Sequence, residues 1–167
     1  TRLTGSLQAA GNLTLKDSLL QGPLQVLAGS SLGLAGTLTN TGTLTVEGSP
    51  YTGGANLNLA ADTTLAGNGS TVLTHQDYSY VYGNGHTLTI GQGHTLRGAG
   101  YLGADGNLNV VNKGSVIAEG GVLRLLLGEG RSFNNVAGTV TVADGAVLDV
   151  SGVRDVAMDM ESNSLLI

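Results

Sequence analysis

A short alternating phrase returns throughout the chain: two apolar residues flank one polar residue, and a turn-forming residue usually stands nearby. It occurs as GNLTL from Gly11, GTLTV from Gly42, ANLNL from Ala55, HTLTI from His86, GNLNV from Gly106, GVLRL from Gly121 and GTVTV from Gly138. A period of two places successive side chains on opposite faces of a strand, one buried and one facing water. A strand that recurs after every turn predicts an all-β solenoid.

The phrases divide the chain into units whose length fits one solenoid coil of two or three short strands. The regular units are 36–54, 86–106, 107–130 and 131–152. The unit 55–85 is about ten residues longer, and the phrases before Gly36 are shorter and less regular. We therefore predict about seven coils, with an extruded loop or hairpin inserted near residues 69–85.

The alternation also predicts which side chains fill the coil. The apolar members are expected to stack inside it in columns: Leu44, Val46, Leu57, Leu59, Leu88, Ile90, Leu108, Val110, Leu123, Leu125, Val140 and Val142. The polar members between them are expected outside: Thr45, Asn58, Thr89, Asn109, Arg124 and Thr141. Small polar residues paired in register between coils can form ladders along the outer surface.

Composition fits a narrow tube better than a broad core. The 167 residues include 28 glycines, one phenylalanine and no tryptophan, so few large side chains are present. Charged residues make up 11% and the net charge is −5, without a basic cluster. Nucleic acid and anionic membrane surfaces are therefore not expected partners. The absence of cysteine excludes disulfides, thiolate nucleophiles and cysteine zinc sites.

Three longer segments carry a family resemblance. They are LTNTGTLTV from Leu38, VNKGSVIAEGGVLRL from Val111 and SFNNVAGTVTVADGAVLDVSG from Ser132. These segments resemble the repeats of bacterial filamentous-haemagglutinin-like exoproteins and autotransporter passengers, and the resemblance extends over most of residues 36–152. The resemblance implies a right-handed parallel β-helix, secreted across the outer membrane and displayed at the bacterial cell surface as an adhesin or its stalk.

The same resemblance implies the context of the chain. Residues 1–167 are expected to form a single β-helix segment of a longer surface protein. The implied partners are a host or bacterial surface glycan or protein, and the outer-membrane secretion pore of the parent protein. End-to-end or lateral self-association is a further expectation, and no cofactor is implied.

The stretch from Val153 to Glu161 fits either a helical or a strand pattern.

A tyrosine-rich stretch is the candidate ligand site. Tyr78, Tyr80 and Tyr82 alternate and would share one face of a strand, and His75, Gln76 and Asp77 lie just before them. Aromatic rings on a rigid surface can stack on a sugar, while the polar side chains supply hydrogen bonds. The competing interpretation is that the tyrosines pack against the flank of the coil and close a hydrophobic patch.

An enzyme on the same scaffold is the alternative function, as a polysaccharide lyase or glycosidase. Such chemistry needs converging carboxyl groups or clustered calcium ligands. The acids are instead scattered, mostly in expected turns: Asp62, Asp77, Asp105, Glu119, Glu129 and Asp144. Asp159 and Glu161 are the two acids predicted to share one strand face. No catalytic residue is therefore assigned, and the protein is expected not to be an enzyme.

Metal binding is not predicted either. His75, His86 and His94 lack the spacing of a metal-binding motif and are expected to be solvent-facing turn residues. The phrase GAGYLGADG from Gly98 is faintly similar to a calcium-binding nonapeptide, but its aspartate pattern does not repeat.

Overall fold

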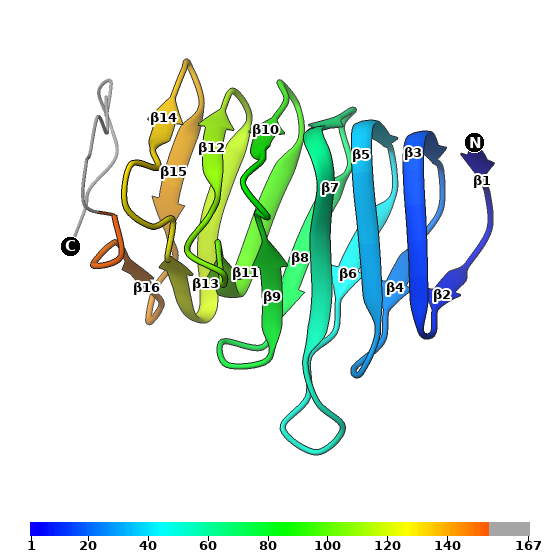
Figure 1. Cartoon of the computed structure of the whole chain (residues 1–167), viewed down its shortest axis with the longest axis horizontal. Helices are drawn as coiled ribbons and strands as arrows, with labels where there is room; N and C mark the ends of the chain where they lie inside the picture. The colour runs from blue at the N-terminus through cyan, green and yellow to red at the C-terminus, as the bar shows by residue number, and fades with distance from the viewer. Residues whose placement is uncertain (154–167) are drawn as a thin grey trace.

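The computed structural model describes residues 1–153, and each of the elements named within them is a β-strand. Figure 1 shows the coils stacked along the long axis of the molecule, with the N-terminus at one end and the last coil at the other. No helix that could span a membrane is found within residues 1–153. Of the ambiguous stretch from Val153 to Glu161, all but Val153 lies outside the described residues.

Parallel pairing arranges the strands in three ladders, which we call faces 1, 2 and 3. Face 1 consists of β2 (Leu7–Ala9), β4 (Leu24–Val26), β6 (Thr43–Val46), β8 (Ser70–Thr74), the first parts of β11 (Thr95–Leu102) and β13 (Ser115–Leu125), and β15 (Thr139–Val142). Face 2 consists of the first parts of β3 (Asn12–Leu20), β5 (Ser31–Asn40) and β7 (Ala55–Ala66), then β9 (Ser79–Tyr82), the last parts of β11 and β13, and β16 (Val147–Asp149). Face 3 consists of β1 (Arg2–Leu3), the last parts of β3, β5 and β7, then β10 (Thr87–Ile90), β12 (Asn109–Asn112) and β14 (Phe133–Asn135).

Each face therefore holds seven strand segments, separated by six steps from coil to coil. This confirms the predicted parallel β-helix and its approximate coil number. The chain visits face 3, face 1 and face 2 in that order in every coil. Because β3, β5 and β7 each bend around a corner, they run from face 2 of one coil into face 3 of the next.

The predicted extrusion near residues 69–85 is confined to the 75–78 turn. Residues 70–74 form β8 in face 1 and residues 79–82 form β9 in face 2, so most of the stretch belongs to the coil stack. The unit 55–85 is long because it contains four strand segments instead of three, β7 contributing two of them. The segments that leave the stack are the 75–78 turn and the loop between β6 and β7, both visible in Figure 1.

The alternation predicted the core well. Eleven of the twelve apolar residues assigned to the interior are buried, and Val142, in the last complete coil, is partly buried against them. Aliphatic side chains fill the tube, with Phe133 as a fully buried aromatic residue. The repeated phrase, however, marks a strand and not a coil. GTLTV from Gly42 lies on face 1, ANLNL from Ala55 on face 2 and HTLTI from His86 on face 3, so the outward residues fall on different sides.

Corners are held by polar ties between neighbouring coils. Three aspartates accept hydrogen bonds from backbone amides one coil away: the Thr37 amide bonds to Asp17, the Thr87 amide to Asp62, and the Gly83 and Asn84 amides to Asp105. At Gly98, with φ of 116°, a side chain would collide with the Leu73 carbonyl of the adjacent coil. These ties fix the direction in which each face presents its outer side chains.

Candidate binding surface

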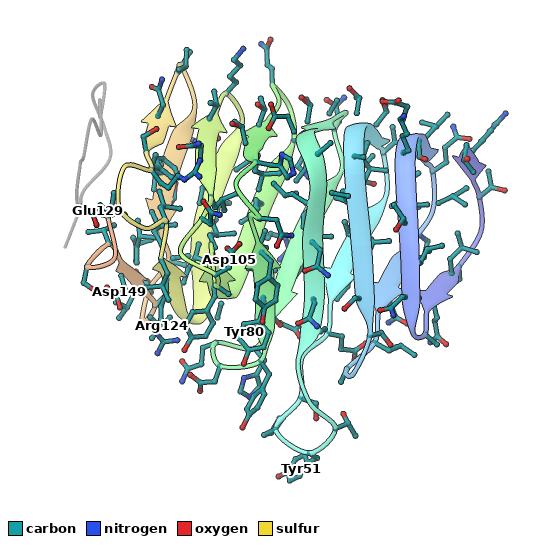
Figure 2. The ribbon with its side chains drawn as sticks, in the orientation of Figure 1. Tyr51, Tyr80, Asp105, Arg124, Glu129 and Asp149 are labelled. Carbon is teal, nitrogen blue, oxygen red and sulfur yellow. The ribbon has the colours of Figure 1, made fainter. Side chains whose placement is uncertain are left out.

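Face 2 carries a row of outward side chains that strand register places one above another. Asn56 pairs with Tyr80, Tyr80 with Tyr101, Tyr101 with Arg124 and Arg124 with Asp149. Figure 2 shows Tyr80, Arg124 and Asp149 following one another along the stack at the same edge. We call Tyr80, Tyr82, Tyr101 and Arg124 the aromatic row. It joins residues that are up to 44 positions apart in the sequence (124 minus 80).

The members of the aromatic row contact one another directly. The ring centroids of Tyr80 and Tyr101 are 5.4 Å apart with planes tilted by 34°, and those of Tyr80 and Tyr82 are 5.9 Å apart. The guanidinium carbon of Arg124 lies 4.9 Å from the centroid of the Tyr101 ring. Aromatic pairs and cation–π contacts of this kind each contribute about 0.5 to 1.5 kcal/mol. The row is therefore an ordered surface of half-buried rings with a cation at one end.

The 75–78 turn is attached to this row. The Tyr80 hydroxyl donates to the Asp77 carbonyl oxygen at 2.6 Å. Arg124 donates through Nη1 to the Gln76 carbonyl oxygen at 2.7 Å and lies 3.4 Å from Asp77 Oδ1. The Val122 amide donates to Gln76 Oε1 at 3.3 Å. Two coils thus fix the turn, which forms one wall beside the rings.

Charge at the surface is largely paired. Burial, followed by the neighbouring Tyr82, Tyr101, Tyr78 and Asp77, raises the pKa of Tyr80, so its hydroxyl stays protonated and continues to donate. Hydrogen bonds from Ser151 lower the pKa of Asp149, and Arg124 lowers it further. Arg124 therefore lies between two carboxylates, those of Asp77 and Asp149.

The predicted site residues are brought together only in part. Tyr80 and Tyr82 do share the outer side of β9, whereas Tyr78 precedes the strand and packs edge-on against His75, with centroids 5.0 Å apart. His75 Nδ1 accepts the Asp77 amide at 3.1 Å, so both of these residues shape the turn. Tyr80 and Tyr82 lie on the coil flank, where the Tyr80 ring packs against those of Tyr82 and Tyr101.

Tyr101 and Arg124 are functional candidates that the sequence did not reveal. Arg124 was expected to face outward, but nothing local indicates that it reaches Tyr101 and the 75–78 turn. The usable signal is the coil register: once Tyr80 is placed opposite Tyr101, the next coil brings Arg124 into the same row.

The expectation of solvent-facing histidines is wrong for His94. That side chain is fully buried beside Thr71, with 3.0 Å between Nε2 and the hydroxyl oxygen. His86 is partly exposed and lies 3.6 Å from Asp62. Within residues 1–153, no group of three or more His, Asp or Glu side chains is arranged to hold a metal ion.

A second projecting feature is the loop between β6 and β7. Reciprocal backbone hydrogen bonds of 3.0 Å between Ser49 and Gly53 close it. Tyr51 stands at its tip with 93% of its surface exposed, as Figure 2 shows. The loop leaves the stack at the same corner as the 75–78 turn, where the Ala55 amide donates to the Tyr78 carbonyl oxygen at 2.9 Å. Both segments therefore border face 2.

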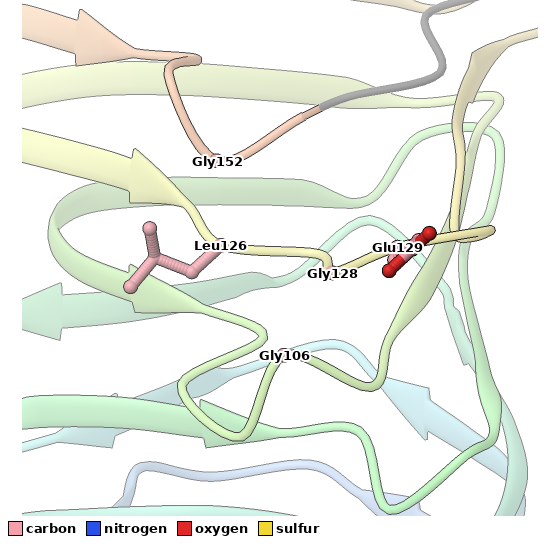
Figure 3. A pocket seen from close by; sticks show the side chains of 5 residues that line it. All are labelled: Gly106, Leu126, Gly128, Glu129 and Gly152. Carbon is pink, nitrogen blue, oxygen red and sulfur yellow. The ribbon is translucent and has the colours of Figure 1, made fainter.

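Among the surface hollows outside the aromatic row, two are considered as ligand sites. One, of about 390 Å³, is lined by Gly106, Leu126, Gly128, Glu129 and Gly152 (Figure 3). Glu129 is its one ionisable lining group, which gives it no acid pair among the described residues. The other, of about 270 Å³, lies on face 2 in the first coils and includes Gly33 and Asn58 in its lining.

Comparison of the chain with protein-family models, with curated proteins and with solved structures finds no match. The function is therefore inferred from the coil geometry and the repeated phrases.

Proposed function

We propose that this chain is a structural and adhesive segment of a secreted bacterial cell-surface protein, and that it binds a surface glycan or protein through face 2. The supporting observation is the aromatic row, which collects Tyr80, Tyr82, Tyr101 and Arg124 from three successive coils. Rings held on a rigid ladder lose little conformational freedom on binding, so more of the contact energy contributes to affinity.

The use of the acidic residues also supports a binding role over catalysis. Asp17, Asp62 and Asp105 accept backbone amides at corners, and Glu119 pairs with Arg97 at 2.6 Å. A carboxylate that accepts such bonds serves as a structural link between coils. Face 2 therefore offers stacking and hydrogen bonding as its main chemistry.

A panel of bacterial and host polysaccharides incubated with the purified chain tests this proposal. Retention and newly formed reducing or unsaturated ends are recorded in the same wells. We expect retention without new ends, and a loss of retention in Tyr82→Ala and Tyr101→Ala. Tyr51→Ala, which removes an aromatic ring outside the row, is the control for non-specific binding by exposed aromatic rings.

Other outcomes point elsewhere. New ends would replace the adhesive proposal with the lyase or glycosidase alternative. Retention that survives both substitutions in the aromatic row but is lost in Tyr51→Ala would move the binding surface to the β6–β7 loop. The absence of retention on every polysaccharide and on intact host and bacterial cells would leave a passive spacer.

A further inference from the structure

The hollow on face 2 lies next to the aromatic row. Strand register puts Thr14 opposite Gly33, Gly33 opposite Asn58 and Asn58 opposite Tyr82, so these four positions form a second outward row beside the first. The hollow of about 270 Å³ is lined by the first three positions. The fourth, Tyr82, is the register partner of Asn58, so the hollow lies one coil away from the aromatic row.

Gly33 lines this hollow, and the backbone conformation at this position does not require a glycine. It lies within β5, and it is not among the glycines with positive φ. The nearest atoms to a side chain added there belong to the Thr14 side chain, at 2.8 Å, and not to a neighbouring backbone. Many other glycines either turn a corner or lie against the backbone of the next coil. At Gly33 the outward row therefore has no side chain of its own, and the Thr14 side chain lies close beside the bare backbone.

The lining of the hollow combines apolar side chains, those of Leu13, Leu59 and Ala60, with uncharged polar ones, as a sugar ring combines an apolar face with hydroxyls. Its polar side chains are amides and hydroxyls: Asn12, Thr14, Ser31, Asn58 and Asn84. None of the charged residues between positions 1 and 153 lines it. Amides and hydroxyls both donate and accept hydrogen bonds, as sugar hydroxyls do. Asn56 donates to Ser31 at 3.1 Å, whereas no hydrogen bond of the Asn58 amide to the protein is found within residues 1–153.

We propose that face 2 takes an uncharged oligosaccharide whose chain runs along the solenoid axis, with one part on the aromatic row and the next part in the Gly33 hollow. This inference rests on the proposed adhesive function and names its ligand class. From the coil of Thr14 to that of Tyr101 there are four steps of about 4.8 Å, or about 19 Å. That length accommodates several linked sugar rings, so affinity rises with the length of the oligosaccharide.

Calorimetric titration with neutral hexasaccharides of glucose, mannose and N-acetylglucosamine, each beside its own disaccharide, tests this site. The variant Thr14→Ala/Gly33→Asn fills the hollow while relieving the contact with Thr14, and Thr14→Ala alone is its matched control. We expect the filled variant to lose about tenfold in affinity for the hexasaccharide, equivalent to one or two hydrogen bonds, with its disaccharide affinity unchanged. An unchanged melting temperature shows that the variant is folded.

The outcomes separate the two proposals. Wild-type hexasaccharide affinity in the filled variant, with loss in Tyr82→Ala, overturns the hollow site and leaves the adhesive surface in place. Binding of an oligogalacturonate hexamer in preference to every neutral hexamer overturns the ligand class. Failure of all these oligosaccharides to bind overturns this inference, whereas retention on cells that depends on the aromatic row still supports adhesion.

Discussion

The pH dependence of the stability of this solenoid depends on single buried polar residues, and His94 is the clearest case. It is enclosed beside Thr71, and its Nδ1 atom has no hydrogen-bond partner among the described residues. Burial lowers its pKa from 6.5 to about 4, because the charged imidazolium would lose its hydration. The folded chain therefore keeps His94 neutral where the unfolded chain does not.

The stability of the fold should consequently depend on pH. Between pH 6.5 and about 4 the unfolded chain binds a proton at His94 that the folded chain rejects, so stability is complete above 6.5 and falls as the pH decreases. The loss reaches roughly 3 kcal/mol at the lower end. Urea unfolding at pH 7 and pH 4.5 measures it.

The variant His94→Asn is the control for that prediction, because an amide does not titrate. Its free energy of unfolding should change much less between the two pH values, even if it is lower at pH 7. Equal pH dependence in the variant and the parent would mean that His94 is not the group responsible.

The inner columns make a second prediction at this scale. Leu108 is fully buried, so Leu108→Asp places an unpaired charge inside the coil and should cost about 3 to 5 kcal/mol. The neighbouring Asn109→Asp keeps an oxygen that can accept the Ser132 amide and should change stability little. Thermal unfolding of both variants checks this, and equal melting temperatures would show that Leu108 is not an interior position.

At the corners, where the chain changes direction, hydrogen bonds from backbone amides to side chains of the neighbouring coil join the elements. Asp105 accepts the Gly83 and Asn84 amides at 2.9 and 2.6 Å and so holds the turn that follows β9. Asp105→Ala should lower the free energy of unfolding by about 1 to 2 kcal/mol, since two amides lose a charged acceptor. Asp144→Ala, at another exposed turn, should change it by less than about 0.5 kcal/mol. Chemical denaturation of the pair measures the difference.

Arg124 ties an element on face 2 to a turn two coils away. Removing it in Arg124→Gln should release the 75–78 turn, because the bond to the Gln76 carbonyl oxygen and the ion pair with Asp77 both weaken. Hydrogen exchange at residues 76–80 should accelerate severalfold while β10 and β12 keep their protection.

Arg97→Gln breaks a comparable ion pair with Glu119 on face 1 and is the matched control. It should leave exchange in the 75–78 turn unchanged. Protection of that turn that is the same in all three proteins would mean that Arg124 does not hold it.

The sequence predicts elements better than their placement for a physical reason. Whether a side chain points inward depends on local alternation, which is why the positions from Leu44 to Val140 were assigned correctly. Which face a strand occupies depends on the number of residues in each of the preceding corners. The 75–78 turn and the long β6–β7 loop change that number from coil to coil. The neighbourhood of Tyr80, Tyr101 and Arg124 therefore needs the register of the whole stack.

At the scale of the molecule, one side of a rigid three-faced stack differs from the other two. Faces 1 and 3 present Thr45, Thr89, Asn109 and Thr141 on their outer surfaces, whereas face 2 carries the aromatic row and the Gly33 hollow. Continuous ladders make neighbouring coils support one another, so ligand contacts can be distributed over several coils without ordering new structure. A segment of this kind can bind its ligand without conformational change, because the coils already hold the contact residues in place.

The most direct test of this account is to locate the ligand on the folded chain by NMR. The isotopically labelled protein is titrated with the neutral hexasaccharides, and amide shifts are mapped onto the three faces. The account predicts that the largest shifts fall on the face 2 segments around Asn58, Tyr82 and Tyr101, with faces 1 and 3 unaffected. Shifts centred on face 1 or face 3, or confined to the loop that carries Tyr51, would contradict it.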